Sequence, residues 1–390
     1  TMSVSFDNTE IAFRYRSDKA LKKAQYMFAF MGSPAATQMG IGLTKLAFKI
    51  SLPISGIIKK TVFQLFCGGE TLAEAAQTAA MLHKYNIGVA LDYGVEGKST
   101  EADFDAAVPE FIKAIDYAAA QPNIPFIPIK ITGFARFDLL EKIHNKKELD
   151  ETEQQEWNNV WTRIESICKR AHEKSIRILV DAEESWIQDP IDDLTNAMMA
   201  RFNQEKAIVF NTFQMYLHTS LPYLKKSLQI AEEQGFILGA KIVRGAYMEK
   251  ERARANAMGY LSPVQPNKKS TDNDYDVAVK YCIDNIDRIH TFIGTHNEES
   301  CYKAIKLMQE KGIAPGDDRV YFSQLYGMSD NISFNLSDAG YNCCKYLPYG
   351  PVKDVMPYLM RRAQENTSVA GQTGRELSLI NKEVLRRRGQ

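Results

Sequence analysis

The sequence lacks the features that mark several common protein classes. Its 390 residues carry a formal net charge of zero. Because there is no excess of positive charge, we expect no nucleic-acid partner. The six cysteines, at positions 67, 168, 282, 301, 343 and 344, form no CxxC pair and no zinc-finger spacing, which favours reduced, buried thiols. Polar residues interrupt every apolar run before it reaches the ~20 residues that would span a bilayer.

Several catalytic motifs are missing as well. There is no GxGxxG dinucleotide fingerprint, no GxSxG nucleophile elbow, no HExxH and no cluster of His and Cys. These absences exclude the common dinucleotide-binding, serine-hydrolase and zinc-peptidase signatures. We therefore expect no metal ion in this protein.

Acidic residues are absent from one long segment. Between Lys19 and Gly69 there are seven lysines but no Asp or Glu, and many apolar residues lie between the lysines. One interpretation is a basic amphipathic segment that contacts an anionic membrane peripherally. The alternative, which is more common, is a set of helices that pack on the main domain with solvated lysines. We expect residues 1–85 to form an N-terminal helical arm and residues 86–390 to form the main domain.

After this arm, short apolar runs alternate with segments of helical spacing. The runs are continuous rather than alternating, as in parallel strands that are covered on both faces. This order predicts an α/β protein with a distorted (β/α)8 TIM-type barrel and an N-terminal helical extension. A doubly wound sheet is the alternative, because alternation alone does not close a barrel. The runs are 88–93, 125–132, 176–183, 207–215, 238–247, 291–296, 320–326 and 343–349.

A polar group follows nearly every predicted strand, which is where barrel enzymes carry their active sites. Lys130 and Asp181, at the ends of the second and third strands, can form a buried or half-buried ion pair. Such a pair can set the electrostatics around a substrate amine. A structural ion pair is the simpler interpretation for any one of these residues, but the full ring of polar strand ends favours a ligand site.

The helix predicted after the last strand carries a second candidate site. Tyr358, Arg361, Arg362 and Glu365 lie at i, i+3, i+4 and i+7, which places them on one helical face. Two guanidinium groups on one face can hold a carboxylate through charge-assisted hydrogen bonds. An exposed, solvated Arg-Arg-Glu face is the alternative.

Several motifs, in order along the chain, resemble those of the proline dehydrogenase family. They are Leu91-Asp-Tyr93, Val180-Asp-Ala-Glu183, Lys241-Ile-Val-Arg-Gly-Ala-Tyr247, Gly294-Thr-His-Asn297, Tyr346-Leu-Pro-Tyr-Gly350 and Tyr358-Leu-Met-Arg-Arg-Ala-Gln-Glu-Asn366. Together they cover about residues 60–385. The form of the Lys241 motif resembles the monofunctional, mitochondrial-type branch. Bifunctional bacterial members carry arginine where Lys241 stands, so the group that contacts flavin N5 is left open.

The resemblance implies an enzyme that binds FAD non-covalently and oxidises L-proline to Δ1-pyrroline-5-carboxylate. Electrons would pass to a membrane quinone, either ubiquinone or menaquinone. By the family's motifs, Lys130 and Asp181 would lie beside the substrate, and Arg361 and Arg362 would bind its carboxylate. The substrate ring would be walled by Ile242, Tyr247, Tyr346 and Tyr358. The flavin contacts would come from Gln214, Lys241, Val243, Gly245, Thr271, His296, Asn297 and Glu365.

Other functions remain open on the sequence alone. Tyr358 favours proline over hydroxyproline, since a phenol there leaves little room for a ring hydroxyl, but a hydroxyproline dehydrogenase is an alternative. A Schiff-base lyase could use Lys130 or Lys241 as its nucleophile. A metal-dependent enzyme could use Asp181, Glu183 and Glu184, and a non-enzymatic membrane-surface protein could act through residues 19–69.

The start of the chain shows no secretory pattern, and Asp7 and Glu10 are unlike a transit peptide. We therefore expect a cytoplasmic protein that is peripheral to the inner membrane. A mature mitochondrial protein on the matrix side of the inner membrane is the alternative.

Overall fold

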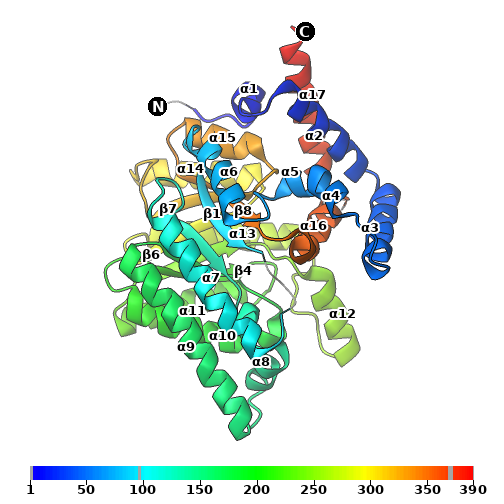
Figure 1. Ribbon diagram of the computed structural model, residues 1–390. Helices are drawn as coiled ribbons and strands as arrows, with labels where there is room; N and C mark the ends of the chain where they lie inside the picture. Colours follow the sequence, from blue (N-terminus) through cyan, green and yellow to red (C-terminus); the bar gives the residue numbers. More distant parts are fainter. Residues whose placement is uncertain (1–2, 95–97, 368–371, 390) are drawn as a thin grey trace. The chain divides into compact units, whose positions relative to one another are not determined.

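The computed structural model describes residues 3–94, 98–367 and 372–389, with the side chains of 365–367, 372 and 373 left out (Figure 1). The chain forms two compact units. Unit 1 consists of residues 1–96 and 324–390, and unit 2 consists of residues 97–323. The predicted boundary at residue 85 remains a prediction.

Unit 1 is mainly helical, with two strands. Its elements are α1 (Thr9–Phe13), α2 (Asp18–Met31), α3 (Pro34–Lys49), α4 (Ser55–Ile58), the π-helix η1 (Lys59–Phe63), α5 (Gln64–Phe66), α6 (Leu72–His83), β1 (Gly88–Tyr93), α15 (Asp330–Asp338), β8 (Cys343–Tyr349), α16 (Val352–Thr367) and α17 (Gln372–Arg387).

Unit 2 alternates strands and helices. Its elements are α7 (Glu101–Ala119), β2 (Phe126–Ile129), η2 (Ile131–Gly133), α8 (Phe137–His144), α9 (Glu151–Lys174), β3 (Arg177–Val180), η3 (Ser185–Ile187), α10 (Gln188–Phe202), β4 (Val209–Gln214), α11 (Ser220–Gln234), β5 (Leu238–Val243), α12 (Met248–Met258), α13 (Lys268–Asp284), β6 (Ile289–Gly294) and α14 (Glu298–Glu310). Strand β7 (Val320–Leu325) runs across the boundary between the units.

The eight strands follow one another in the order of a closed barrel, β1 to β8. Within unit 2, neighbouring strands from β2 to β6 pair in parallel, and β6 pairs with the first part of β7. Within unit 1, β1 pairs in parallel with β8, from Gly88 opposite Cys344 to Tyr93 opposite Tyr349. The predicted (β/α)8 fold is confirmed, and the doubly wound alternative is wrong because the strand order closes.

Seven of the eight apolar runs contain a whole strand, whereas β6 begins at Ile289, two residues before its run, and several strands end earlier than the run does. Strand β2 ends at Ile129, β3 at Val180 and β5 at Val243. Lys130 and Asp181 therefore come directly after their strands, where the backbone leaves the ladder. This position lets a side chain at the carboxyl end of the barrel reach a ligand.

The strands of unit 2 place a layer of aromatic residues on one face. Phe126 of β2 makes edge contacts with Phe210 of β4, Phe292 of β6 and Tyr321 of β7, at ring-centroid distances of 5.7, 4.8 and 4.9 Å. Because β2 pairs with none of these strands among the described ladders, the rings meet across the face rather than along one ladder. They fill the space below the carboxyl ends of the strands, as in other barrels.

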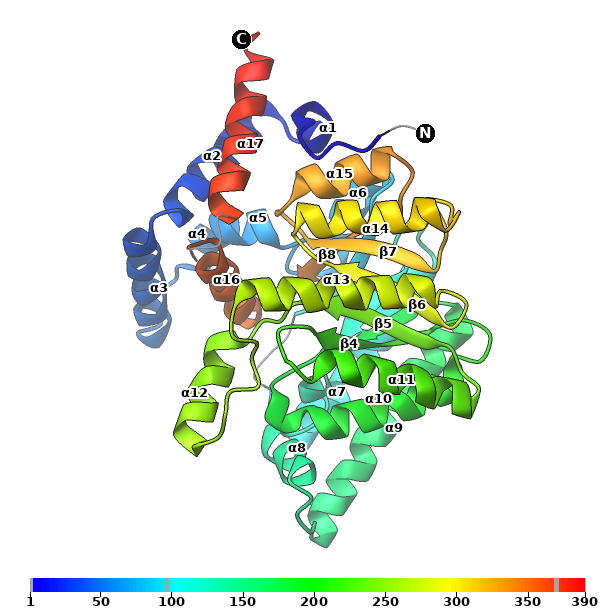
Figure 2. The same ribbon diagram turned by 180° about the vertical axis from the view of Figure 1, so that it is seen from behind.

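Unit 1 has its own apolar core, formed largely by its helices. Phe28 of α2 and Phe66 of α5 meet edge to face at 6.3 Å, and Leu359 of α16 and Ile380 of α17 complete the same cluster. Figures 1 and 2 both show α2 beside α17. Residues close to the two ends of the described chain therefore stabilise one another. Among the described residues, none of the helices is long and apolar enough to cross a membrane.

Candidate active site

Three charged side chains meet at the carboxyl ends of β2, β3 and β5. Lys130 donates to Asp181 Oδ2 at 2.7 Å, and Lys241 donates to Asp181 Oδ1 at 2.9 Å. The side chains of Asp181 and Lys241 are each 9% exposed, and that of Lys130 is 28% exposed. The predicted ion pair of Lys130 with Asp181 is present, and Lys241 turns it into a three-residue cluster with a formal charge of +1.

Strand alternation explains why these residues meet. Side chains of successive strand residues point to opposite faces, so Phe126 and Lys130, four residues apart, share a face. The register places Lys241 opposite Phe292, and the Lys241 ammonium lies 5.9 Å from the centroid of that ring. The cluster therefore lies on the same face as the aromatic layer, beyond its carboxyl end. Removing one partner of such a buried ion pair usually costs about 3–5 kcal/mol.

The neighbouring carboxylates of the same loop are engaged elsewhere. Glu183 accepts hydrogen bonds from the Thr132 hydroxyl and from the Thr132 backbone N–H, the latter at 3.2 Å. Glu184 accepts from Lys250 at 2.6 Å. In the part of the chain that the structure describes, no three His, Cys, Asp or Glu side chains are grouped so that they could hold a metal ion. The geometry gives no support to the metal-dependent alternative.

Glu183 makes the stability of the fold dependent on pH. Burial raises the pKa of its carboxyl group to about 7 from an ordinary 4.5, although the hydrogen bonds from Thr132 and the charge of Lys130 oppose the shift. A raised carboxyl pKa means that the folded state keeps a proton that the unfolded state has already lost. This contribution to stability is present below about pH 4.5 and is lost as the pH rises through about 7.

We predict that Glu183→Gln removes this part of the pH dependence. Because the amide carries no charge to bury, the variant should gain about 3 kcal/mol relative to the parent between pH 4.5 and pH 8. Urea unfolding at both pH values measures the difference. The exposed Glu205 provides the control, Glu205→Gln, which should follow the parent. Equal pH slopes for the parent and Glu183→Gln would show that Glu183 is ionised in the fold.

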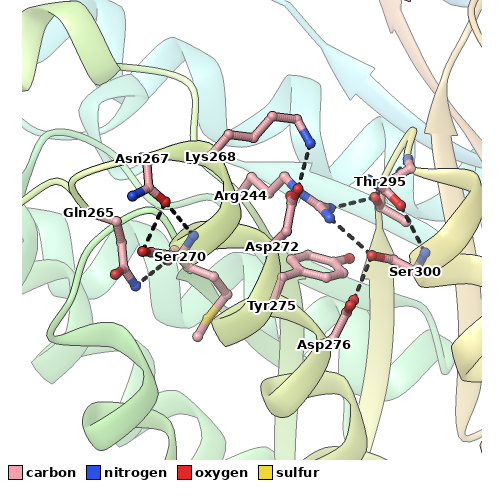
Figure 3. A network of polar contacts seen from close by, with 12 residues as sticks. Arg244, Gln265, Asn267, Lys268, Ser270, Asp272, Tyr275, Asp276, Thr295 and Ser300 are labelled. Atoms are coloured by element: carbon pink, nitrogen blue, oxygen red, sulfur yellow. Dashed lines mark hydrogen bonds and ion pairs between the residues drawn. The ribbon is translucent and has the colours of Figure 1, made fainter. Parts of the chain in front are cut away.

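The turn after β5 is anchored by Arg244 (Figure 3). Its guanidinium donates to Asp272 Oδ1 at 2.7 Å, to the Thr295 hydroxyl at 2.7 Å and to the Ser300 hydroxyl at 3.0 Å. It also lies over the Tyr275 ring, 4.1 Å from the centroid. Arg244 therefore ties the end of β5 to α13 and to the segment between β6 and α14. These are the segments that hold most of the predicted cofactor residues.

The predicted cofactor residues of unit 2 lie at neighbouring strand ends. Gln214 is buried and donates to the Glu183 carbonyl at 3.0 Å, and the register pairs Gln214 with Val243. Thr271 is buried in the first turns of α13. His296 is half-buried, and the next residue, Asn297, caps α14 by accepting from the Ser300 N–H at 2.9 Å.

Gly245 has a conformation that only glycine adopts readily. Its φ is +148°, and a Cβ at this position would lie 2.3 Å from the Tyr216 ring. The backbone after β5 therefore approaches the Tyr216 ring more closely than it could if residue 245 carried a side chain. The two residues Gly245 and Ala246 are exposed, so this turn presents its backbone to solvent or to a ligand.

The two residues of unit 2 that are predicted to wall the substrate ring, Ile242 and Tyr247, differ in burial. Ile242 follows Lys241 in β5, so its side chain points to the opposite face of the strand. It is fully buried, and its carbonyl accepts from the Tyr275 hydroxyl of α13 at 3.1 Å. Its place in the set that walls the substrate ring stays a prediction. Tyr247 is half-buried at the start of α12 and stays in the set.

The second candidate site lies on α16 in unit 1. Arg362 is buried, with 9% exposed, and its guanidinium lies over the Tyr358 ring at 4.8 Å from the centroid. Arg361, one residue earlier, is half-buried. Burial raises the pKa of the Tyr358 hydroxyl well above its usual range. Tyr346 of β8 is buried as well, whereas the side chain of Glu365 lies outside the described residues.

Two features of the site were missed by reasoning on the sequence. Lys241 is predicted to contact the flavin, or to be the nucleophile of a lyase, but its ion pair with Asp181 is not predicted. Arg244 stands in the Lys241–Tyr247 motif without a predicted role, although it connects three segments. No local pattern signals either contact, because Lys241 lies 60 residues from Asp181 and Arg244 lies 51 residues from Thr295.

Comparison with known proteins gives a consistent family. The family model described as proline dehydrogenase matches residues 75–375. The carbapenem antibiotics biosynthesis protein CarD of Pectobacterium carotovorum subsp. carotovorum is 35% identical over 332 residues, which is 85% of this chain and 86% of that protein. The mitochondrial proline dehydrogenase 1 of Caenorhabditis elegans is 34% identical over 91% of this chain and 58% of its own length. A hydroxyproline dehydrogenase of Xenopus laevis is 33% identical over 85% of this chain and 78% of its own length.

A solved structure supports the same fold. Proline utilization A (PutA) from Bdellovibrio bacteriovorus, inactivated by N-propargylglycine, aligns with a TM-score of 0.73 at 20% identity. The alignment covers 95% of this chain and 40% of that one. This chain thus spans less than half of that protein, and little more than half of the nematode enzyme.

Proposed function

Because this chain belongs to the proline dehydrogenase family, we propose that it oxidises L-proline to Δ1-pyrroline-5-carboxylate with FAD as its cofactor. The observation that carries the proposal is the cluster of Lys130, Asp181 and Lys241 at the carboxyl ends of the strands. This is the end of the barrel at which such folds hold their substrates. The predicted roles of the individual residues, Ile242 included, are part of this proposal.

The donors at the strand ends fit a flavin. Lys241 and Gln214 carry N–H donors suited to the polar edge of the isoalloxazine ring, and the turn at Gly245 allows close approach to its backbone. His296 and Asn297, which come directly before α14, are proposed contacts as well. Val243, Thr271 and Glu365 complete the proposed contacts. FAD, when bound, supplies the hydride acceptor at its N5 atom.

The charged residues would orient the substrate and control its protonation. Arg361 and Arg362 would hold the carboxylate by planar, charge-assisted hydrogen bonds, and Tyr247, Tyr346 and Tyr358 would enclose the ring. The amine must be neutral when it reacts, because a protonated nitrogen cannot donate electrons toward the departing hydride. The net charge of +1 on the cluster disfavours an ammonium group beside it and thereby lowers the pKa of the amine.

The same geometry argues against the Schiff-base lyase. A lysine must lose its proton before it can attack a carbonyl group. Lys130 and Lys241 both donate to Asp181, so each is held in an ion pair rather than directed at a carbonyl group. Borohydride trapping of a carbonyl substrate on either lysine is therefore not expected.

A visible spectrum of the purified protein tests the cofactor, reaction class and substrate together. We expect flavin absorption bands that bleach when L-proline is added without oxygen. Hydroxyproline, added in parallel, should bleach them more slowly, because the phenol of Tyr358 leaves little room for a ring hydroxyl. Faster bleaching by hydroxyproline would assign the enzyme to that substrate instead. A protein that cannot be reconstituted with FAD would refute the proposal.

The proposed electron acceptor is a membrane quinone, either ubiquinone or menaquinone. A quinone in a bilayer requires that the enzyme reach the membrane surface, and residues 19–69 are the proposed contact. The proposed location is the cytoplasmic face of the inner membrane, with the matrix side of the mitochondrial inner membrane as the alternative. The identity to a mitochondrial relative supports the second of these locations.

A further inference from the structure

Helix α3 of unit 1 exposes a stripe of large apolar side chains. Met39, Leu43, Leu46 and Ile50 are spaced by four, three and four residues, so they lie on one side of the helix and continue to its end. Their exposed fractions are 64, 61, 52 and 57%. These four residues are called the α3 stripe below. A soluble surface rarely gathers so many exposed apolar side chains in one row unless they bind something.

The opposite side of α3 is already used in packing. Thr37 is buried there, and Phe48 packs against the core of unit 1. Both views of the ribbon show α3 as the outermost helix of unit 1, with α16 on one side of it (Figures 1 and 2). The packed side accounts for the fold of α3, so the α3 stripe requires a different explanation.

Exposed apolar residues continue on both sides of the α3 stripe in the sequence. Tyr26 and Phe30 of α2 are 66 and 51% exposed, and Leu52 and Ile57 are 51 and 67% exposed. The Phe30 ring would lie 3.7 Å from a Cβ on Gly40, so it borders α3. In the described part of the chain, eight of the fifteen exposed large apolar residues fall between residues 26 and 57. The exposure is therefore a local property of this segment.

The charged residues that neighbour the α3 stripe along the chain are all basic. Lys45 and Lys49 are exposed on α3, and both come directly before a residue of the stripe. The seven lysines of residues 19–69 have no acidic residue among them. Lys59 differs from the lysines of α3 because it forms salt bridges with two acidic residues outside the segment, Glu70 and Glu74. An apolar row bordered by lysines is complementary to an anionic lipid surface.

We propose that the α3 stripe, together with Leu52 and Ile57, inserts into the headgroup region of an anionic bilayer. The membrane contact itself is inferred from the exposed side chains and their charge. Its role, which is to bring the enzyme to a quinone, rests on the proposed function. A second copy of the chain is a poorer partner. A two-fold symmetric contact would bring the same surface of both copies together, which would gather the lysines of both copies at one interface.

Vesicle flotation tests the proposal with the full chain. The parent should float with vesicles that contain phosphatidylglycerol, less with pure phosphatidylcholine, and less at high salt. Leu43→Ser combined with Leu46→Ser should weaken binding by at least about tenfold, because two large apolar side chains no longer leave water. Lys45→Glu with Lys49→Glu should abolish the preference for anionic vesicles. Leu261→Ser is the matched control, since Leu261 is 94% exposed in unit 2, and it should bind as the parent does.

Activity with a soluble dye as electron acceptor separates this inference from the proposed function. The stripe variants should oxidise proline with the dye at the parental rate but lose activity with a quinone held in vesicles. If the parent does not oxidise proline, the proposed function is refuted. Vesicle flotation would then still show whether the α3 stripe binds a membrane. Failure of the parent to float, or flotation of the Leu43 and Leu46 variant like the parent, would overturn the membrane surface. If the parent dimerises but does not bind vesicles, and the Leu43 and Leu46 variant is monomeric, the α3 stripe is a contact with a second copy of the chain.

Discussion

Replacing Arg361 or Arg362 with methionine is expected to raise the KM for L-proline by about 100- to 1000-fold while FAD stays bound. Loss of one partner from a buried, charge-assisted contact typically costs about 3–4 kcal/mol, which corresponds to this range. The arginines orient the substrate and do not carry the redox chemistry, so kcat should fall less than kcat/KM. Steady-state kinetics with proline, together with the flavin absorbance of each variant, measures both effects.

The two arginines offer an internal comparison. Arg362 is buried and stacks on Tyr358, so Arg362→Met also removes a packing contact, and its melting temperature should be recorded. Arg361 is half-buried, and its variant should fold like the parent. Lys353→Met changes an exposed cation on the same helix and should leave the KM unchanged. Parental kinetics in both arginine variants would eliminate the carboxylate-binding role.

Asp181→Asn is expected to lower kcat/KM for proline by about 100- to 1000-fold. The substitution removes the only negative charge of the cluster, so the Lys130 and Lys241 ammonium groups repel each other at a site that is largely buried. Breaking a buried ion pair in this way costs about 3–5 kcal/mol, and part of this cost will appear as lower thermal stability. Comparing kcat/KM with the melting temperature separates the loss of activity from the loss of folded protein.

A pH profile distinguishes an electrostatic role of the cluster from a merely structural one. Lys130→Met lowers the net charge of the cluster from +1 to zero, so the substrate amine should hold its proton more strongly. The acidic limb of kcat/KM should then move to higher pH. Asp181→Asn raises the net charge and should move the same limb to lower pH. Shifts in the same direction, or no shift, would show that the cluster supports the fold without controlling the amine.

The site shows which contacts a sequence can and cannot predict. The pairing of Lys130 with Asp181 was predictable because each follows a strand and each needs an opposite charge when it is partly buried. The second bridge from Lys241 was not predictable, because it depends on the register of β5 against its neighbours. The same register sends Ile242 to the opposite face, which the family motif by itself did not reveal. Glu183 and Glu184 looked like metal ligands until Thr132 and Lys250 were found to engage them.

The sequence by itself determined the order of strands and helices, the polar residues at the strand ends and the family. Continuous apolar runs require burial on both faces, and this requirement can be read without coordinates. The closure of the barrel, the triple contact at Asp181 and the network at Arg244 were decided only by the tertiary structure, since each joins residues far apart in the chain. The spacing of apolar residues in α3 likewise predicts a helix with apolar residues on two sides. Only the tertiary structure decides which side packs against the core of unit 1. That side holds Thr37 and Phe48, and the side left exposed is the α3 stripe.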